Sequence, residues 1–83
     1  MLKVSVISPE KTLFEGEVDA VTAPAFDGEV GILTSHAPMM TLLGKGTLKL
    51  GTGGSAGQFE VEGGFLQVID DRVRVVTEKA SQA

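Results

Sequence analysis

A single histidine, His36, is the first candidate for chemistry in this chain of 83 residues, which has no cysteine, tyrosine or tryptophan. It follows Ser35, and a serine and a histidine can act as nucleophile and base only within hydrogen-bond reach. Adjacent residues of an extended segment point to opposite faces, so these two side chains cannot form such a pair. Nothing in the sequence brings another serine to the histidine. We therefore predict no catalytic residue and no enzyme activity.

Carboxylates and glycines could form two other kinds of site. Glu15, Glu17 and Asp19 share one side of an alternating segment, where three acids could hold a metal. No histidine or cysteine lies near them, and the solvated face of a strand has the same period of two. The glycine-rich segment 51–57 lacks the Lys-Ser/Thr pair and following helix of a phosphate-binding loop, so we interpret it as a hairpin tip. We expect neither a metal nor a cofactor.

Composition excludes several kinds of partner. The formal net charge is −4, and the seven basic residues form no run, so the basic face required for nucleic-acid binding is missing. No apolar run approaches the ~18 residues of a membrane span, and the N-terminus has no signal-peptide core. The absence of cysteine is compatible with a reducing compartment. We expect no nucleic-acid partner and no direct membrane insertion.

The elements that would position these residues are strands, because apolar and polar residues alternate in short runs between Gly, Pro and Asp. This spacing predicts an all-β sandwich or barrel in one domain, 1–83, in which Pro24–Glu29 is a loop. Asp70 and Asp71 should form a tight hairpin turn. A two-residue loop there would pair Val68 with Val73 and Leu66 with Val75, and would place Gln67 opposite Arg74 on the other face. Gly63-Gly64 marks a bulge or a close backbone approach. The last residues, 78–83, could open a helix or fray.

The segment around His36 has the features of a contact loop. Met39 and Met40 cannot both face the core side of a strand, so one of them should be exposed. Adaptable methionine side chains on a surface favour contact with a partner. His36 has a second interpretation, in which it hydrogen-bonds loop backbone and holds the turn before Pro38. From the residues alone, we predict a small β-sandwich with a protein-binding edge.

Three blocks of sequence, in order, resemble the epsilon subunit of F-type ATP synthases, whose mitochondrial counterpart is called delta. Thr34 is a departure, because the family commonly has proline after the Gly-Ile-Leu run. The resemblance implies a two-sheet β-sandwich of roughly ten short, mainly antiparallel strands. The blocks are Val6–Lys11 with Phe14–Val18, then Gly28–Leu33 with His36–Thr41 and Gly46, and finally Phe59–Val68 with Val73–Val76.

The resemblance also implies a function and two interfaces. It implies a non-catalytic subunit of the central stalk (the rotor) of a proton- or sodium-driven F-type ATP synthase. This subunit would link the gamma subunit to the ring of c subunits and support the coupling of ion flow to ATP synthesis. The residues implied for the c-ring are those of a loop, Asp27, Gly28, Glu29, Val30 and Gly31. Those for gamma are Ser8, His36 and Thr41, to which the exposure of adjacent methionines adds Met39 and Met40.

A cellular location and a limit on regulation follow from the same resemblance. The expected place is peripheral, within the wider ATP synthase complex, on the cytoplasmic face of a bacterial inner membrane. The family's C-terminal helical hairpin would begin where this sequence ends. We therefore expect no helical domain, no inhibition by helix extension and no ATP site in these residues. The alternatives are a free-standing adaptor or ligand-binding module and, behind that, an enzyme.

Overall fold

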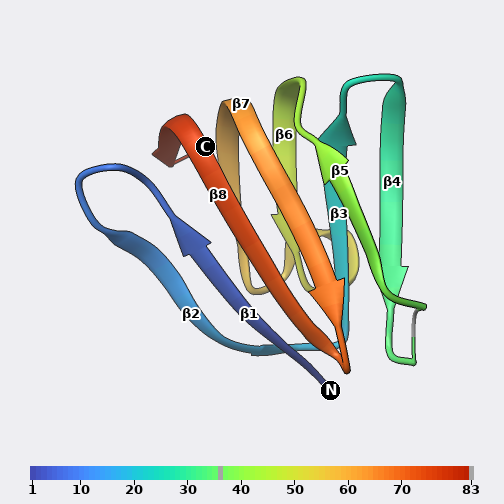
Figure 1. Ribbon diagram of the computed structural model, residues 1–83. Helices are drawn as coiled ribbons and strands as arrows, with labels where there is room; N and C mark the ends of the chain where they lie inside the picture. Colours follow the sequence, from blue (N-terminus) through green and yellow to red (C-terminus); the bar gives the residue numbers. More distant parts are fainter. Residues whose placement is uncertain (36, 83) are drawn as a thin grey trace.

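The computed structural model describes residues 1–35 and 37–82, and strands make up most of that part (Figure 1). His36 and Ala83 lie outside the described residues. A short 3-10 turn, Thr52–Gly54, is the helical element within the described part, where no helix has the length and apolarity to cross a membrane. The strands are β1 (Leu2–Ile7), β2 (Thr12–Val18), β3 (Ala20–Ala25), β4 (Gly28–Leu33), β5 (Met39–Leu42), β6 (Lys45–Leu50), β7 (Gly57–Ile69) and β8 (Arg72–Gln82).

Hydrogen bonds connect these strands into one continuous path, in the order β2-β1-β8-β7-β6-β3-β4, with β5 paired to β7. The pairing of β1 with β8 is parallel, and the other pairings are antiparallel. The parallel pair joins the N-terminal strand to the C-terminal one, with Val4 opposite Val73. The predicted all-β class with mainly antiparallel strands is therefore confirmed.

The two longest strands, β7 and β8, each belong to both layers of a sandwich (Figure 1). The first layer contains β2, β1, the first half of β8, the second half of β7, and β5. The second layer contains β4, β3, β6, the first half of β7 and the second half of β8. The described part therefore has eight strands, fewer than the roughly ten expected, because two long strands serve both layers.

Glycine makes the passage of β7 between layers possible. Gly63 and Gly64 have φ values of 73° and 103°, a region that side chains with a Cβ rarely adopt. A Cβ on Gly64 would overlap the carbonyl oxygen of Val76 and would lie 2.7 Å from the Cα of Thr77. The predicted close backbone approach at Gly63-Gly64 is confirmed. It is the point where β7 and β8 cross together from one layer to the other.

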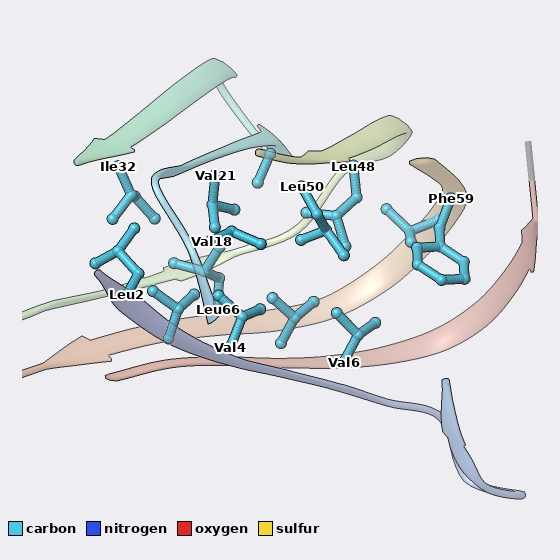
Figure 2. Packing of buried hydrophobic residues seen from close by; sticks show 14 of the residues in the cluster. Leu2, Val4, Val6, Val18, Val21, Ile32, Leu48, Leu50, Phe59 and Leu66 are labelled. Atoms are coloured by element: carbon cyan, nitrogen blue, oxygen red, sulfur yellow. The ribbon is translucent and has the colours of Figure 1, made fainter. Parts of the chain in front are cut away.

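Alternating apolar side chains of both layers form the core (Figure 2). Val4 and Val6 of β1 face Val21 and Leu50 of the second layer (Figure 2). Sixteen apolar residues are buried in this cluster, which extends over both layers. They are Leu2, Val4, Val6, Val18, Val21, Ala23, Ile32, Leu43, Leu48, Leu50, Phe59, Val61, Leu66, Val68, Val73 and Val75.

The hairpin at Asp70-Asp71 has the predicted register. Val68 pairs with Val73, Leu66 with Val75, and Gln67 with Arg74. Both turn residues have positive φ, 49° and 59°, as the hairpin turn that matches the twist of the flanking strands requires. The turn chemistry alone was sufficient to place every side chain of this hairpin on the correct face.

Two sequence-based expectations were wrong. Residues 78–82 neither open a helix nor fray but continue β8 as far as Gln82, because they pair with the first half of β7. The segment Pro24–Glu29 is not one loop. Strand β3 continues to Ala25 and β4 begins at Gly28, so only Phe26 and Asp27 remain as the turn. Pro24 has no N–H to donate, but its carbonyl takes part in the pairing and accepts a 2.8 Å hydrogen bond from the N–H of Gly44.

Candidate interaction surface

The residues predicted to face a c-ring lie at one edge of the second layer. Asp27 is in the β3–β4 turn, and the four residues from Gly28 to Gly31 belong to strand β4. The expectation that this segment is a loop was therefore wrong. Within the described part, β4 pairs with β3 alone, so its other edge is open. Glu29 is exposed, whereas Val30 packs against the core.

The residues predicted to contact gamma lie at two places on the first layer. Ser8 is in the β1–β2 turn, where its hydroxyl donates to the carbonyl of Lys11 at 3.1 Å. Met39, Met40 and Thr41 belong to β5. Met39 packs against the core and Met40 is 68% exposed, which confirms that one of the two methionines must face outward. The prediction for His36 falls outside the described residues.

An apolar row crosses the outer face of the first layer between these two places. It consists of Ile7, Val76, Phe65 and Leu42, from β1, β8, β7 and β5 respectively. Ile7 is opposite Val76, Val76 is opposite Phe65, and Phe65 is opposite Leu42, so the four side chains are neighbours on one face. None of them belongs to the buried core, and Leu42 is 61% exposed. The row is therefore a partly exposed apolar surface, in which Ile7, Phe65 and Val76 are half-buried and Leu42 is the most exposed member.

Sequence reasoning missed this row, although one signal was available. The predicted hairpin put Gln67 on the outer face, and residues two apart in a strand share a face. Phe65 and Ile69 are two residues on either side of Gln67, so both had to point outward as well. The remaining members come from other strands, and the pairing that aligns them could not be read from local periodicity.

Two rows of more polar residues lie beside the apolar row on this outer face. The first contains Met40, Gln67, Arg74, Ser5 and Glu15, in order across the strands. The second contains Ile69, Arg72, Lys3 and Glu17. Along the strands, the outer face therefore changes from apolar to charged. Across them, it changes from basic on β8 and β1 to acidic on β2.

The outer face of the second layer is mainly polar. Lys45, Thr47 and Lys49 of β6 lie beside Glu60 and Glu62 of β7. The Oγ1 of Thr47 donates to Oε1 of Glu60 at 2.6 Å. The exposed large apolar residues outside the first layer are Phe26 in the β3–β4 turn and Leu33 at the end of β4. The two broad faces of the sandwich thus differ in chemistry, and the first-layer face is the better candidate for a protein contact.

The Asp70-Asp71 turn holds the loop that leads to His36. Oδ1 of Asp71 accepts a 2.6 Å hydrogen bond from the backbone N–H of Ser35, which has a positive φ of 67°. The carbonyl of Asp71 accepts a 2.8 Å hydrogen bond from the N–H of Lys3. One turn residue therefore connects the loop after β4, the N-terminal strand and the β7–β8 hairpin.

The acidic residues of the β2 region form no metal site. Glu15, Glu17 and Asp19 are all exposed, which confirms that they form a solvated face. No group of three His, Asp or Glu side chains in the described part of the chain is arranged to hold a metal ion.

Asp19 instead connects two loops. Its carboxylate accepts a 2.6 Å hydrogen bond from the hydroxyl of Thr52 and a 3.0 Å bond from the N–H of the same residue. The hydroxyl first, and the N–H second, lower the pKa of Asp19 below its ordinary value of 3.8. These bonds attach the β2–β3 corner to the start of the glycine-rich loop, which connects β6 to β7 as the predicted hairpin tip.

Replacing Thr52 with valine should raise the pKa of Asp19, because the hydroxyl that stabilises the charged carboxylate is removed. A folded-state pKa below the unfolded value stabilises the fold above about pH 4, and that contribution is lost as the pH falls through the folded pKa. The stability difference between wild type and the Thr52→Val variant should therefore shrink at acid pH. Carboxyl NMR titration of Asp19 measures the first effect. An unchanged pKa would contradict the role given to Thr52.

Comparisons with known proteins place the whole chain in one protein family. The family described as "ATP synthase, Delta/Epsilon chain, beta-sandwich domain" matches residues 1–83. The ATP synthase epsilon chain of Leptospira borgpetersenii is 47% identical over 77 residues, which are 93% of this chain and 61% of that protein. The epsilon chain of Caulobacter vibrioides is 39% identical over 82 residues, 99% of this chain and 95% of that protein. This chain thus spans less than two thirds of the first relative.

Solved structures agree with this match. A chain in the cryo-EM structure of the Euglena gracilis mitochondrial ATP synthase, which contains OSCP, F1 and the c-ring, superposes with a TM-score of 0.86 at 27% identity. The match covers 98% of this chain and 52% of that one. A chain of the central stalk and c-ring structure from Tetrahymena thermophila superposes with a TM-score of 0.79 at 20% identity, covering 98% and 66%. This second likeness supports the fold alone.

Proposed function

We propose that this chain is a non-catalytic part of the rotor of an F-type ATP synthase, because it belongs to the family of the ATP synthase delta/epsilon β-sandwich domain. In this role it joins the gamma subunit to the c-ring and helps to couple proton or sodium flow to ATP synthesis. The epsilon-chain relatives support the proposal, as does the Euglena chain, whose structure contains F1 and the c-ring.

The observation that carries the proposal is the difference between the two broad faces of the sandwich. A rotor component must hold a partner firmly, and a specific interface buries about 800 Å² on each side. The chain exposes 4788 Å² in all and measures 28 × 24 × 21 Å, so such an interface would occupy most of one broad face. The outer face of the first layer has the apolar row that such a contact needs.

The gamma subunit is assigned to that face. The apolar row provides the centre of the contact, and Ser8 and Met40 lie at its margins. Thr41 is opposite the buried Leu66, so it lies on the same side of β5 as Met39. Apolar and aromatic side chains at the centre of an interface usually supply most of the affinity. Met39 packs against the core, so its part in this contact is to support β5 from beneath.

The c-ring is assigned to the β3–β4 turn and the open edge of β4. Asp27, Gly28, Glu29 and Gly31 are exposed there, and Phe26, which is 67% exposed, adds an apolar side chain that the sequence did not indicate. Val30 packs inward and holds the strand in place. A carboxylate such as Glu29 mainly sets the orientation of a contact, because an exposed ion pair contributes only about 0–1 kcal/mol. The complex would be peripheral on the cytoplasmic face of a bacterial membrane.

Charge reversal at Glu29 tests the ring contact. The Glu29→Lys variant should bind the gamma-containing rotor normally but assemble with the c-ring about 3- to 10-fold more weakly, because it replaces attraction with repulsion. Assembly is measured by co-purification of the reconstituted complex at equal protein concentrations. Its fold should be intact, since the side chain is exposed on an edge strand.

The matched control is Glu10→Lys, which makes the same charge change in the β1–β2 turn, at the other end of the strand order. It should leave ring assembly unchanged. Unfolding of the isolated Glu29→Lys variant would show that the residue is structural, and normal ring assembly would show that the assignment is wrong. Failure of the wild-type chain to join a complex of gamma and c-ring would reject the proposed function itself.

A further inference from the structure

Both arginines of the chain, Arg72 and Arg74, lie on the outer face of the first layer, although the chain is acidic overall, with a net charge of −4. They alternate with the buried Val73 and Val75, so their side chains leave the core together. Lys3 of β1 is directly opposite Arg72. We call these three residues, Lys3, Arg72 and Arg74, the basic band. It runs beside the apolar row on the same face.

The two arginines of the basic band have no ionic partner within the described part of the chain, whereas Lys3 is directly opposite Glu17. No described residue forms an ion pair or a hydrogen bond with the side chain of Arg72 or Arg74. The two arginines line a depression of about 540 Å³ together with Gln67, Ile69 and Asp70. Glu15 shares a row with Arg74, but β1 lies between their strands, which puts their backbones about 9–10 Å apart. The guanidinium groups are therefore available to an outside carboxylate.

We propose that the basic band binds carboxylates of the gamma subunit and thereby fixes the direction in which gamma lies across the apolar row. This inference rests on the proposed function and names the chemistry of the partner surface. Residues two apart in a strand are about 6.7 Å apart, so Arg74 and Arg72 lie roughly 7 and 13 Å from the apolar row. The partner must therefore carry an apolar stripe with Asp or Glu side chains about 7 and 13 Å beyond it.

Acidic residues around the band define what it can accept. Glu15 and Glu17 of β2 lie on one side and Asp70 lies at the hairpin turn. A reversed partner would place its acids on the other side of the apolar row, where they cannot reach the arginines. A partner displaced toward β2 would bring its acids over Glu15 and Glu17, which repel them. A polyanion such as a nucleic acid would meet the same repulsion along its whole length. One or two carboxylates on a protein fit the band because an arginine fork binds them in a bidentate manner.

The test measures the affinity of gamma for charge-reversal variants at low and at high salt. The Arg74→Glu and Arg72→Glu variants should each bind about tenfold more weakly at low salt, since each brings two like charges together. Their affinity should rise with added salt, while that of the wild type falls, because salt screens repulsion and attraction alike. The matched control, Lys49→Glu on the outer face of the second layer, should show neither effect.

A chemical cross-link locates the partner group. The Arg74→Lys variant keeps the positive charge and presents an amine, so a carbodiimide should join it to an Asp or Glu of bound gamma, as mass spectrometry would show. No such link should form at the native Lys49. If Leu42→Asp abolishes binding but both arginine reversals leave affinity and salt dependence unchanged, this inference is overturned and the proposed function stands. If wild type does not bind gamma at all, both fail.

Discussion

The Phe65→Asp substitution should lower the affinity of the chain for the gamma subunit by about 30-fold or more. Phe65 is in the middle of the apolar row, between Val76 and Leu42. Removing a central aromatic anchor typically costs at least about 2 kcal/mol of binding free energy, and each 1.4 kcal/mol is a factor of ten. The new carboxylate would also have to lose its water in the contact, which adds to the loss. Isothermal titration with purified gamma measures the change.

Two further variants separate binding from folding. Phe65 is half-buried, so its loss could also destabilise the sheet. Leu42 is 61% exposed, and Leu42→Asp should leave the melting temperature nearly unchanged while weakening gamma binding in the same way. Thr22→Asp introduces the same charge on the outer face of the second layer and should not affect binding. Equal losses for Leu42→Asp and Thr22→Asp would contradict a contact specific to the first layer.

The Gly64→Ala variant should lose most or all of the stability of the domain. A Cβ at this position would collide with the Val76 carbonyl oxygen, and the φ of 103° is strained for alanine. Together, overpacking and backbone strain can cost more than about 4 kcal/mol. A domain of this size has only about 4–12 kcal/mol of unfolding free energy. Urea denaturation followed by circular dichroism should show a variant that is unfolded or close to it.

Gly31→Ala is the matched control for that prediction. Gly31 is also a strand glycine, but its φ is not in the positive region and a Cβ there would have no neighbour within 4 Å. Its substitution should change the unfolding free energy by less than about 0.5 kcal/mol. A Gly64→Ala variant as stable as Gly31→Ala would show that β7 can cross between the layers without glycine.

Local chemistry made part of this molecule predictable. The turn at Asp70-Asp71 determined the register of its hairpin, and the adjacency of Met39 and Met40 required one exposed side chain. The alternation of apolar and polar residues identified the short runs as strands, and in the first of them Leu2, Val4 and Val6 are all buried. These predictions needed only the two faces of a strand and the geometry of a two-residue turn.

Pairing between distant segments was not predictable in this way. The parallel contact of Val4 with Val73 joins the two ends of the chain, and the strand over 78–82 exists because β7 lies beside it. The apolar row has the same origin. Neither Ile7 nor Leu42 is marked as a surface residue by the sequence around it. Ile7 becomes a neighbour of Val76, and Leu42 of Phe65, only through the pairing of distant strands. The candidate site is therefore largely a product of topology.

Protection of a single thiol in the complex tests the central claim, that gamma covers the outer face of the first layer. The chain has no cysteine, so Leu42→Cys and Glu62→Cys each create one thiol, on the outer faces of the first and second layers. Both should react rapidly with a maleimide in the free chain. After gamma binds, the thiol at position 42 should react with the maleimide at least about tenfold more slowly. The thiol at position 62 should react at an unchanged rate. Equal rates at position 42 with and without bound gamma would contradict the account.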